Sequence, residues 1–238
     1  APVVNNGTAS MLSKDGQGKV LLVASNSYSG VTAIYQGALT VGGASTQTLS
    51  GVISGPGALA KEGSGQLTLS GNNTYMGPTT VSAGTIVVQN SNALGDKGAG
   101  TVVASGGALD LGGTLGAQGL NLGAEMITVS GSGADGRGAL VNNSNTSQYN
   151  ALRFVTLAGD TTFGGAQSGG RWDIRNTATP STLEMNGYTL TKKGPNMVGL
   201  TGVTVTPGAG NIDIQEGTFT VEAGTTLGTS AENAMTVR

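Results

Sequence analysis

Apolar and polar residues alternate along short stretches of the chain, and Gly, Asn or Ser ends each stretch. Val20 and Leu22 form one such pair, and Leu67 and Leu69 form another. Alternation of this kind is typical of a short β-strand that buries one face. No stretch of ten residues has the period of an amphipathic helix. The pattern therefore predicts an all-β protein built from short strands.

A long internal repeat accompanies this alternation. Residues 18–41 match residues 65–88 without a gap, at an offset of 47 residues. The matched pairs include Leu22 with Leu69, Asn26 with Asn73, Tyr28 with Tyr75, Leu39 with Ile86, and Val41 with Val88. A weaker third copy begins at Leu190, 131 residues after Leu59. Strands this short cannot each bury a face alone, so a repeat on this scale indicates stacked units.

We therefore predict a right-handed parallel β-helix, which is a β-solenoid with about three short strands in each coil. If 47 residues span two coils, each coil takes about 23 residues and the 238-residue chain makes about ten coils. Inward residues would then form stacked ladders of Val, Leu and Ile. A β-sandwich or a barrel also uses short strands, but neither accounts for an ungapped repeat of 47 residues.

The composition narrows the chemistry that the chain can perform. There is no His and no Cys, which excludes Ser-His-Asp and Cys-His catalysis, imidazole metal ligands and disulfides. We predict no catalytic residues, no cofactor and no metal site. The eleven Lys and Arg residues form no basic run, so we expect no nucleic-acid partner. No apolar stretch has the length of a membrane span.

Residues 63–75, with the sequence Gly-Ser-Gly-Gln-Leu-Thr-Leu-Ser-Gly-Asn-Asn-Thr-Tyr, resemble the autotransporter-associated β-strand repeat. The similarity continues through Gly-Pro-Thr-Thr-Val at 77–81, Ala-Gly-Thr-Ile-Val-Val at 83–88 and Asn-Ser-Asn-Ala-Leu-Gly at 90–95. It covers residues 55–95 best and extends to 18–41 and 183–228. Repeats of this family are typical of the passenger domains of autotransporters, the type V secreted proteins of Gram-negative bacteria.

The resemblance implies that residues 1–238 are a single β-helix segment of a longer surface protein. It implies export through the outer membrane by a C-terminal barrel in the full-length chain, and an extracellular location on a Gram-negative cell. The expected role is that of a non-catalytic stalk or adhesin, or a self-associating surface. The partners would be a host or bacterial surface ligand, or further copies of the chain.

Two other functions remain open from the residues themselves. A polysaccharide lyase or hydrolase can be built on a β-helix, but the thirteen acidic residues are scattered along the chain. A subunit of an extracellular fibre would stack end to end, because an uncapped β-helix exposes unpaired backbone groups at its ends.

Two segments depart from the alternation and are expected to be loops that project from the solenoid, residues 135–150 and 160–182. Loops on a rigid scaffold often carry binding residues. The largest side chains in these segments give the candidate binding residues Arg137, Tyr149, Arg171 and Trp172. The alternative for Trp172 is a place in the core beside Ile174, beneath an outer row of Arg and Asp.

Overall fold

The computed structural model describes residues 11–26, 28–113, 119–175, 180–206, 210–228 and 235–238. These residues form 24 β-strands and no α-helix, so the all-β prediction is confirmed. All the strand pairings between them are parallel. None of the described residues belongs to a helix long and apolar enough to cross a membrane.

The strands stack into three faces, which we number in the order in which the chain visits them. Face 1 begins with β1 (Leu12–Lys14), β3 (Thr32–Ile34) and β6 (Ile53–Ser54), and ends with β15 (Gln148–Leu152), β17 (Arg171–Arg175), β20 (Met197–Thr201) and β23 (Thr218–Val221). Face 2 contains β2 (Val20–Leu22), β4 (Ala38–Val41), β7 (Ala58–Lys61), β9 (Thr79–Val81), β11 (Thr101–Val103), β13 (Met126–Gly131), the first part of β16 (Phe154–Gly164), β18 (Ser181–Glu184) and β21 (Val203–Val205). Face 3 contains β5 (Gln47–Leu49), β8 (Gln66–Leu69), β10 (Gly84–Val88), β12 (Gly107–Asp110), β14 (Leu140–Val141), the second part of β16, β19 (Leu190–Lys192), β22 (Ile212–Ile214) and β24 (Met235–Val237).

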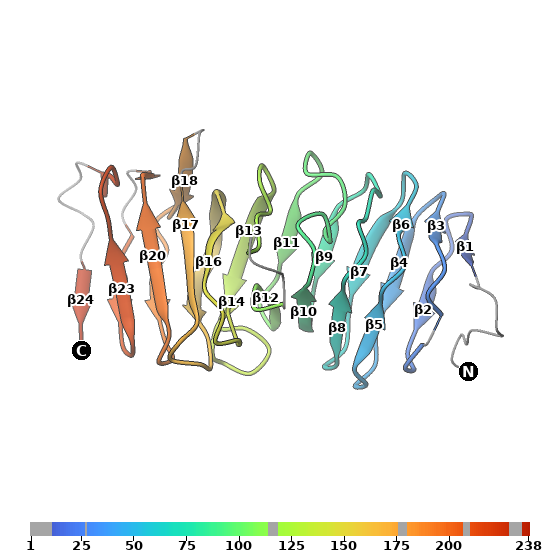
Figure 1. Cartoon of the computed structure of the whole chain (residues 1–238), viewed down its shortest axis with the longest axis horizontal. Helices are drawn as coiled ribbons and strands as arrows, with labels where there is room; N and C mark the ends of the chain where they lie inside the picture. Colours follow the sequence, from blue (N-terminus) through green and yellow to red (C-terminus); the bar gives the residue numbers. More distant parts are fainter. Residues whose placement is uncertain (1–10, 27, 114–118, 176–179, 207–209, 229–234) are drawn as a thin grey trace.

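Each turn of the chain contributes one strand to face 2, so the described part of the chain makes about nine turns. The turns lie side by side along the long axis, with the two ends of the chain at opposite ends (Figure 1). The fold is therefore the parallel β-solenoid that the alternation and the repeat predict.

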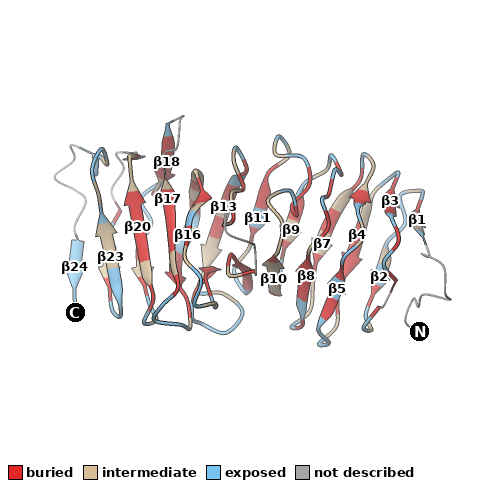
Figure 2. Ribbon diagram, in the orientation of Figure 1, coloured by how far each residue is buried: buried red, intermediate tan, exposed pale blue. Residues whose placement is uncertain are grey.

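The core lies inside this stack, where alternate side chains of every face meet. On face 3, Leu67, Ile86, Leu109 and Leu140 follow one another in register, and all four are fully buried. Burial along successive strands is visible in Figure 2. Such stacked aliphatic ladders supply the main stabilising term, because each turn removes apolar surface from water on both sides.

The mean turn has the predicted length, because the eight turns that link Val20 to Val205 along face 2 take 185 residues, about 23 each. The 47-residue offset, however, does not span two whole turns. Val20 pairs with Leu39, and Leu39 pairs with Leu59, so one turn takes 19 or 20 residues in this region. An offset of 47 residues is therefore two turns plus one face. The repeat also extends upstream of residues 18 and 65, because Leu12 and Lys14 match Leu59 and Lys61 at the same offset. Copy 1 therefore begins with β1 and β2 on faces 1 and 2, whereas copy 2 begins with β7 and β8 on faces 2 and 3. Copy 3 begins with β19 and β20, on faces 3 and 1.

The pairing inside a copy is nevertheless constant. In copies 1 and 2 the first strand pairs with the third, as in β1 with β3 and β7 with β9, and the second with the fourth, as in β2 with β4 and β8 with β10. Copy 3 contains one additional strand, β21, after β20. The equivalent pairs there are β19 with β22 and β20 with β23. Each copy thus contains strands from consecutive turns that pair with each other. Copies 1, 2 and 3 begin on faces 1, 2 and 3, so each copy starts one face further around the solenoid axis than the copy before it.

One buried lysine occupies the same position in all three copies. Lys14, Lys61 and Lys192 each end the first strand of a copy, and none is more than 1% exposed. The Lys61 ammonium donates to the backbone oxygens of Glu62, Gly63 and Ala83 at 2.9, 2.7 and 3.2 Å. Lys192 donates to three equivalent carbonyls, and Lys14 to two. The lysine therefore connects the turn after the first strand of its copy to a turn about 22 residues later, and it donates to backbone carbonyls in both.

The expectation that residues 135–150 and 160–182 are projecting loops is wrong for much of both segments. The first contains β14 and the beginning of β15, and the second contains the end of β16, all of β17 and the beginning of β18. Within the described residues, the connections are the shorter stretches 132–139, 142–147 and 165–170. The alternation in β17 is hidden because charged side chains occupy its outer positions. Much of both segments therefore belongs to the strands that form the three faces of the solenoid.

Candidate functional site

The strands β15, β17, β20 and β23 form a separate four-stranded sheet on face 1, and its outer side carries an aromatic and ionic cluster. We call Tyr149, Arg171, Asp173, Arg175 and Glu222 the Tyr149 surface. Tyr149 comes from β15, the next three residues from β17, and Glu222 directly follows β23. The register places Arg171 beside Met197 and Arg175 beside Thr201. Parallel stacking therefore brings together residues that are up to 73 positions apart.

Asp173 is the centre of the ionic network. Its carboxylate accepts two hydrogen bonds from Arg171, at 2.7 and 3.0 Å, and two from Arg175, at 3.1 and 2.6 Å. Although it occupies an outer position of β17, Asp173 is fully buried beneath these two guanidinium groups. A buried carboxylate needs such compensation, because an unpaired one would cost several kcal/mol.

Glu222 closes the network from the last described turns. Arg171 Nη2 lies 2.5 Å from Glu222 Oε1, and Thr201 Oγ1 donates to Glu222 Oε2 at 2.9 Å. The hydrogen bonds from Arg171 and Thr201 lower the pKa of Glu222, so it is ionised at neutral pH. Two guanidinium groups therefore face two carboxylates, and the cluster as a whole carries no net charge.

Gly199 provides the space in which this network forms. It lies next to Asp173 on β20. A Cβ atom at this position would lie 2.5 Å from Asp173 Oδ1 and 2.7 Å from Arg171 Nη2. Any side chain here would push the ion pair apart, so the absence of a side chain is a requirement of the cluster.

Tyr149 is the exposed part of the surface, with 48% of its area accessible. The guanidinium carbons of Arg171 and Arg175 lie 5.2 and 5.4 Å from the centre of its ring. Cation–π contacts at these distances hold the ring in one place. The result is a fixed, half-exposed aromatic ring with guanidinium groups at its base, which is a common composition for the centre of a protein interface.

The structure brings together two of the four predicted binding residues, Tyr149 and Arg171. Trp172 lies in the core, where it is fully buried, packs edge-on against Phe163 and donates to the carbonyl of Gly164 at 3.0 Å. Its indole therefore cannot contact a partner of the folded chain, and the alternative of a core Trp beneath a charged row is correct.

Arg137, the fourth candidate, lies elsewhere. It belongs to the connection between β13 and β14, and its guanidinium is exposed, 3.7 Å from Asp135. It lines a shallow polar hollow with Lys193 and Glu216. An exposed pair at this distance contributes little to stability, so Arg137 is free to contact solvent or a partner.

Glu222 and Gly199 carried no signal in the sequence that linked them to Arg171. Glu222 is 51 residues from Arg171, and only the pairing of β17, β20 and β23 makes them neighbours. Arg175 belongs to the dense charged stretch 171–175, so the alternation of that stretch is a signal for its place on the outer side.

The repeated tyrosines are structural. Tyr28 and Tyr75 are 3% and 0% exposed, and their hydroxyl groups form hydrogen bonds with Thr32 and Thr79 at 2.9 and 2.5 Å. Burial raises the pKa of both hydroxyls. Neither ring is available to stack on a ligand.

One further acidic residue is unusual. Glu125, directly before β13, is 2% exposed, and burial raises its pKa to about 7. Its partner is the hydroxyl of Thr101, which donates at 2.7 Å. Within the part of the chain that the structure describes, no group of three or more Asp and Glu residues is arranged to hold a metal ion.

Comparison with known families gives one result. The model of the passenger-associated-transport-repeat family matches residues 12–41 and residues 59–88. These stretches are copies 1 and 2 of the 47-residue repeat, and each contains the four strands that pair within a copy. No curated protein and no solved structure matches the chain.

Proposed function

The chain contains two autotransporter passenger repeats within a parallel β-solenoid, and on this premise we propose that it is a non-catalytic, adhesive segment of a passenger domain. In this proposal it is displayed on the surface of a Gram-negative cell, and the full-length chain continues into a C-terminal outer-membrane barrel. The Tyr149 surface is its contact site for a host or bacterial surface ligand, or for another copy.

The observation that carries the proposal is the self-contained pairing of each repeat. In copies 1 and 2, the first strand pairs with the third and the second with the fourth, so each copy contains strand partners of its own. A chain without cysteine that forms its turns one after another can cross a membrane pore unfolded and then fold on the far side. Each completed turn offers an open strand edge to the next turn.

The chemistry of the Tyr149 surface supports contact and not catalysis. Its two carboxylates are ion-paired with Arg171 or Arg175, so their oxygens are engaged within the cluster and not directed at a substrate. The exposed Tyr149 ring is held by cation–π contacts, so little conformational freedom is lost when a partner binds. An aromatic ring with nearby guanidinium groups is the composition of an interface hot spot.

The proposal is tested by display of the chain, fused to an outer-membrane barrel, on a Gram-negative cell that lacks other adhesins. Attachment to host cells and aggregation between bacteria are both measured. We expect Tyr149→Ala to reduce at least one of them about tenfold, as for a central aromatic anchor. Tyr35→Ala is the matched control, because Tyr35 is also exposed, at 53%, but lies after β3.

Surface antibody labelling and protease resistance establish that both variants are exported and folded. If Tyr149→Ala cells attach and aggregate as well as the parent, the Tyr149 surface is not the contact site. If the parent cells do neither, the adhesive role is wrong. Release of products from a polysaccharide by the purified chain would contradict the non-catalytic role.

A further inference from the structure

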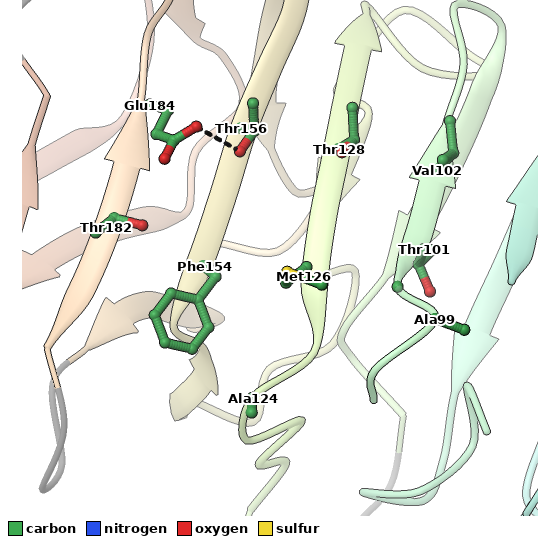
Figure 3. Close-up of a pocket in the computed structure, with 11 residues that line it drawn as sticks. Ala99, Thr101, Val102, Ala124, Met126, Thr128, Phe154, Thr156, Thr182 and Glu184 are labelled. Carbon is green, nitrogen blue, oxygen red and sulfur yellow. Dashed lines mark hydrogen bonds between the residues drawn. The ribbon is translucent and has the colours of Figure 1, made fainter. Parts of the chain in front are cut away.

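A second surface feature lies on face 2, where a hollow crosses the outer side of β11, β13, β16 and β18 (Figure 3). Two rows of outward side chains form its floor. The first row contains Met126, Phe154 and Thr182, and the second contains Val102, Thr128, Thr156 and Glu184. Small residues, among them Ala99 and Ala124, border the hollow at the start of these strands.

The side chains in this hollow differ from those on β9, β7 and β4, the three preceding strands of face 2. The residues in register with Val102 on those strands are Thr80, Ala60 and Thr40, which are small. The first strand of the face, β2, carries the exposed Leu21 in the same row. In the hollow, Met126 and Val102 are 52% and 41% exposed. A group of exposed apolar side chains rimmed by polar ones is typical of a binding surface.

We propose that this hollow binds a short, neutral oligosaccharide, with its sugar rings lying across the strands. The proposal rests on the proposed surface role and names a ligand class for a site separate from the Tyr149 surface. A sugar ring has an apolar face of C–H groups and a rim of hydroxyl groups. In the proposed complex, the Phe154 and Met126 side chains pack against the apolar face of the sugar. The polar groups of Thr128, Thr156 and Glu184 form hydrogen bonds with its hydroxyl groups.

The dimensions of the floor suit this ligand. The two rows are two residues apart along each strand, which is about 7 Å, and neighbouring strands are about 4.8 Å apart. The floor from β11 to β18 therefore extends about 14 Å along the solenoid axis. Each of these strands is also paired on both sides, which limits its movement.

The charge of the hollow decides between neutral and acidic sugars. Among the residues that the structure describes, Glu184 is the only charged one that lines it. Thr156 Oγ1 donates to Glu184 Oε2 at 3.1 Å, which orients the carboxylate along the second row. A carboxylate held in this way accepts hydrogen bonds from sugar hydroxyls, and it repels uronic acids and sulfated sugars.

Other occupants fit less well. A peptide that adds as a β-strand needs a free strand edge, whereas the hollow lies on the flat side of strands that are paired on both sides. A lipid surface would strip water from Glu184 and three threonine hydroxyls without replacing their hydrogen bonds.

The test is a titration of the purified chain followed by NMR of the Met126 methyl group. The probes are neutral trisaccharides of glucose, galactose, mannose and N-acetylglucosamine, with trigalacturonate as the acidic probe and a lysine-rich peptide as the cationic one. We expect at least one neutral probe to shift the Met126 signal in a saturable way, and trigalacturonate to leave it unchanged. We expect Phe154→Ala to weaken that binding about tenfold.

Tyr35→Ala and Glu62→Gln are the matched controls, because they remove an exposed ring and an exposed carboxylate outside the hollow. Glu184→Gln is expected to weaken neutral binding and to reduce discrimination against trigalacturonate. The proposal is overturned if no neutral probe shifts the signal, if trigalacturonate binds equally well, if only the peptide binds, or if folded Phe154→Ala binds like the parent. Adhesion that depends on Tyr149 is measured separately, so either proposal can fail while the other stands.

Discussion

The buried carboxyl group of Glu125 makes the stability of the solenoid depend on pH. It is 2% exposed, it accepts a hydrogen bond from the Thr101 hydroxyl, and it interacts electrostatically with Asp96, Lys97 and the Tyr75 hydroxyl. Burial raises its pKa to about 7; the Thr101 hydrogen bond and Lys97 oppose this rise, and Asp96 adds to it. Below this pKa the folded chain holds Glu125 in its neutral form.

The sign of the effect follows from proton binding. Between the ordinary glutamate pKa of 4.5 and the folded value of about 7, the folded chain binds a proton that the unfolded chain has released. The free energy of unfolding therefore falls as pH rises through this window, and the full stabilisation is present only below it. The difference between the two pKa values corresponds to about 3 kcal/mol, which is a large part of an ordinary domain stability.

The assay is urea denaturation of the purified chain at a series of pH values from 4.5 to 7.5. We expect the parent to lose about 3 kcal/mol across this range, whereas Glu125→Gln keeps the Thr101 hydrogen bond and loses most of the slope. The slope can be attributed to carboxyl groups because the chain has no His, the residue whose titration normally dominates this pH range. Asp110, whose pKa burial also raises, adds a slope of the same sign in both proteins.

Glu62→Gln is the control, since Glu62 is exposed and should leave the slope unchanged. A parent stability that is constant from pH 4.5 to 7.5 would refute the reasoning. So would an equal slope in Glu125→Gln, because the carboxyl group would then not be the source of the effect.

Two other predictions concern the repeat and the register. Lys61→Met should destabilise the chain by about 2 kcal/mol, because three backbone carbonyls lose their donor; Lys19→Met, at an exposed ion pair, should change the stability by less than about 0.5 kcal/mol in the same urea assay. Leu49→Asp should cost several kcal/mol because it buries an unpaired carboxylate, whereas Thr48→Asp, one residue earlier on the exposed side of β5, should cost far less. Equal losses within either pair, measured by urea or thermal unfolding, would contradict the assigned side-chain positions.

The sequence predicted the packing of single strands well. Leu67 and Leu69 alternate with polar residues, and both are fully buried in β8. The prediction from alternation was wrong at β17, which was expected to be part of a loop. Its inner residues are Trp172 and Ile174, but its outer residues Arg171, Asp173 and Arg175 are charged. These charges lower the apolar content of the segment, so its sequence resembles that of a loop.

The binding candidates were only partly predictable for the same reason. Large side chains in irregular sequence identified Tyr149 and Arg171, which do lie together. Their partner Glu222 and the buried Glu125 depend on neighbours in other turns, and no local pattern indicates them. Phe154 and Glu184 of the hollow likewise come from separate turns.

The sequence by itself determined the strand type, the inward residues of most strands and the existence of a repeated unit, because a side-chain period of two is a local property of the extended backbone. The tertiary structure alone decided how long each turn is and which face each copy occupies. Those features depend on which strands pair across a turn, and the 47-residue offset fits both two long coils and two short coils plus one face. The pairing of Val20 with Leu39 selects the second arrangement. It places Lys14, Lys61 and Lys192 on successive faces, and it creates the Tyr149 surface and the hollow from residues that are distant in the chain.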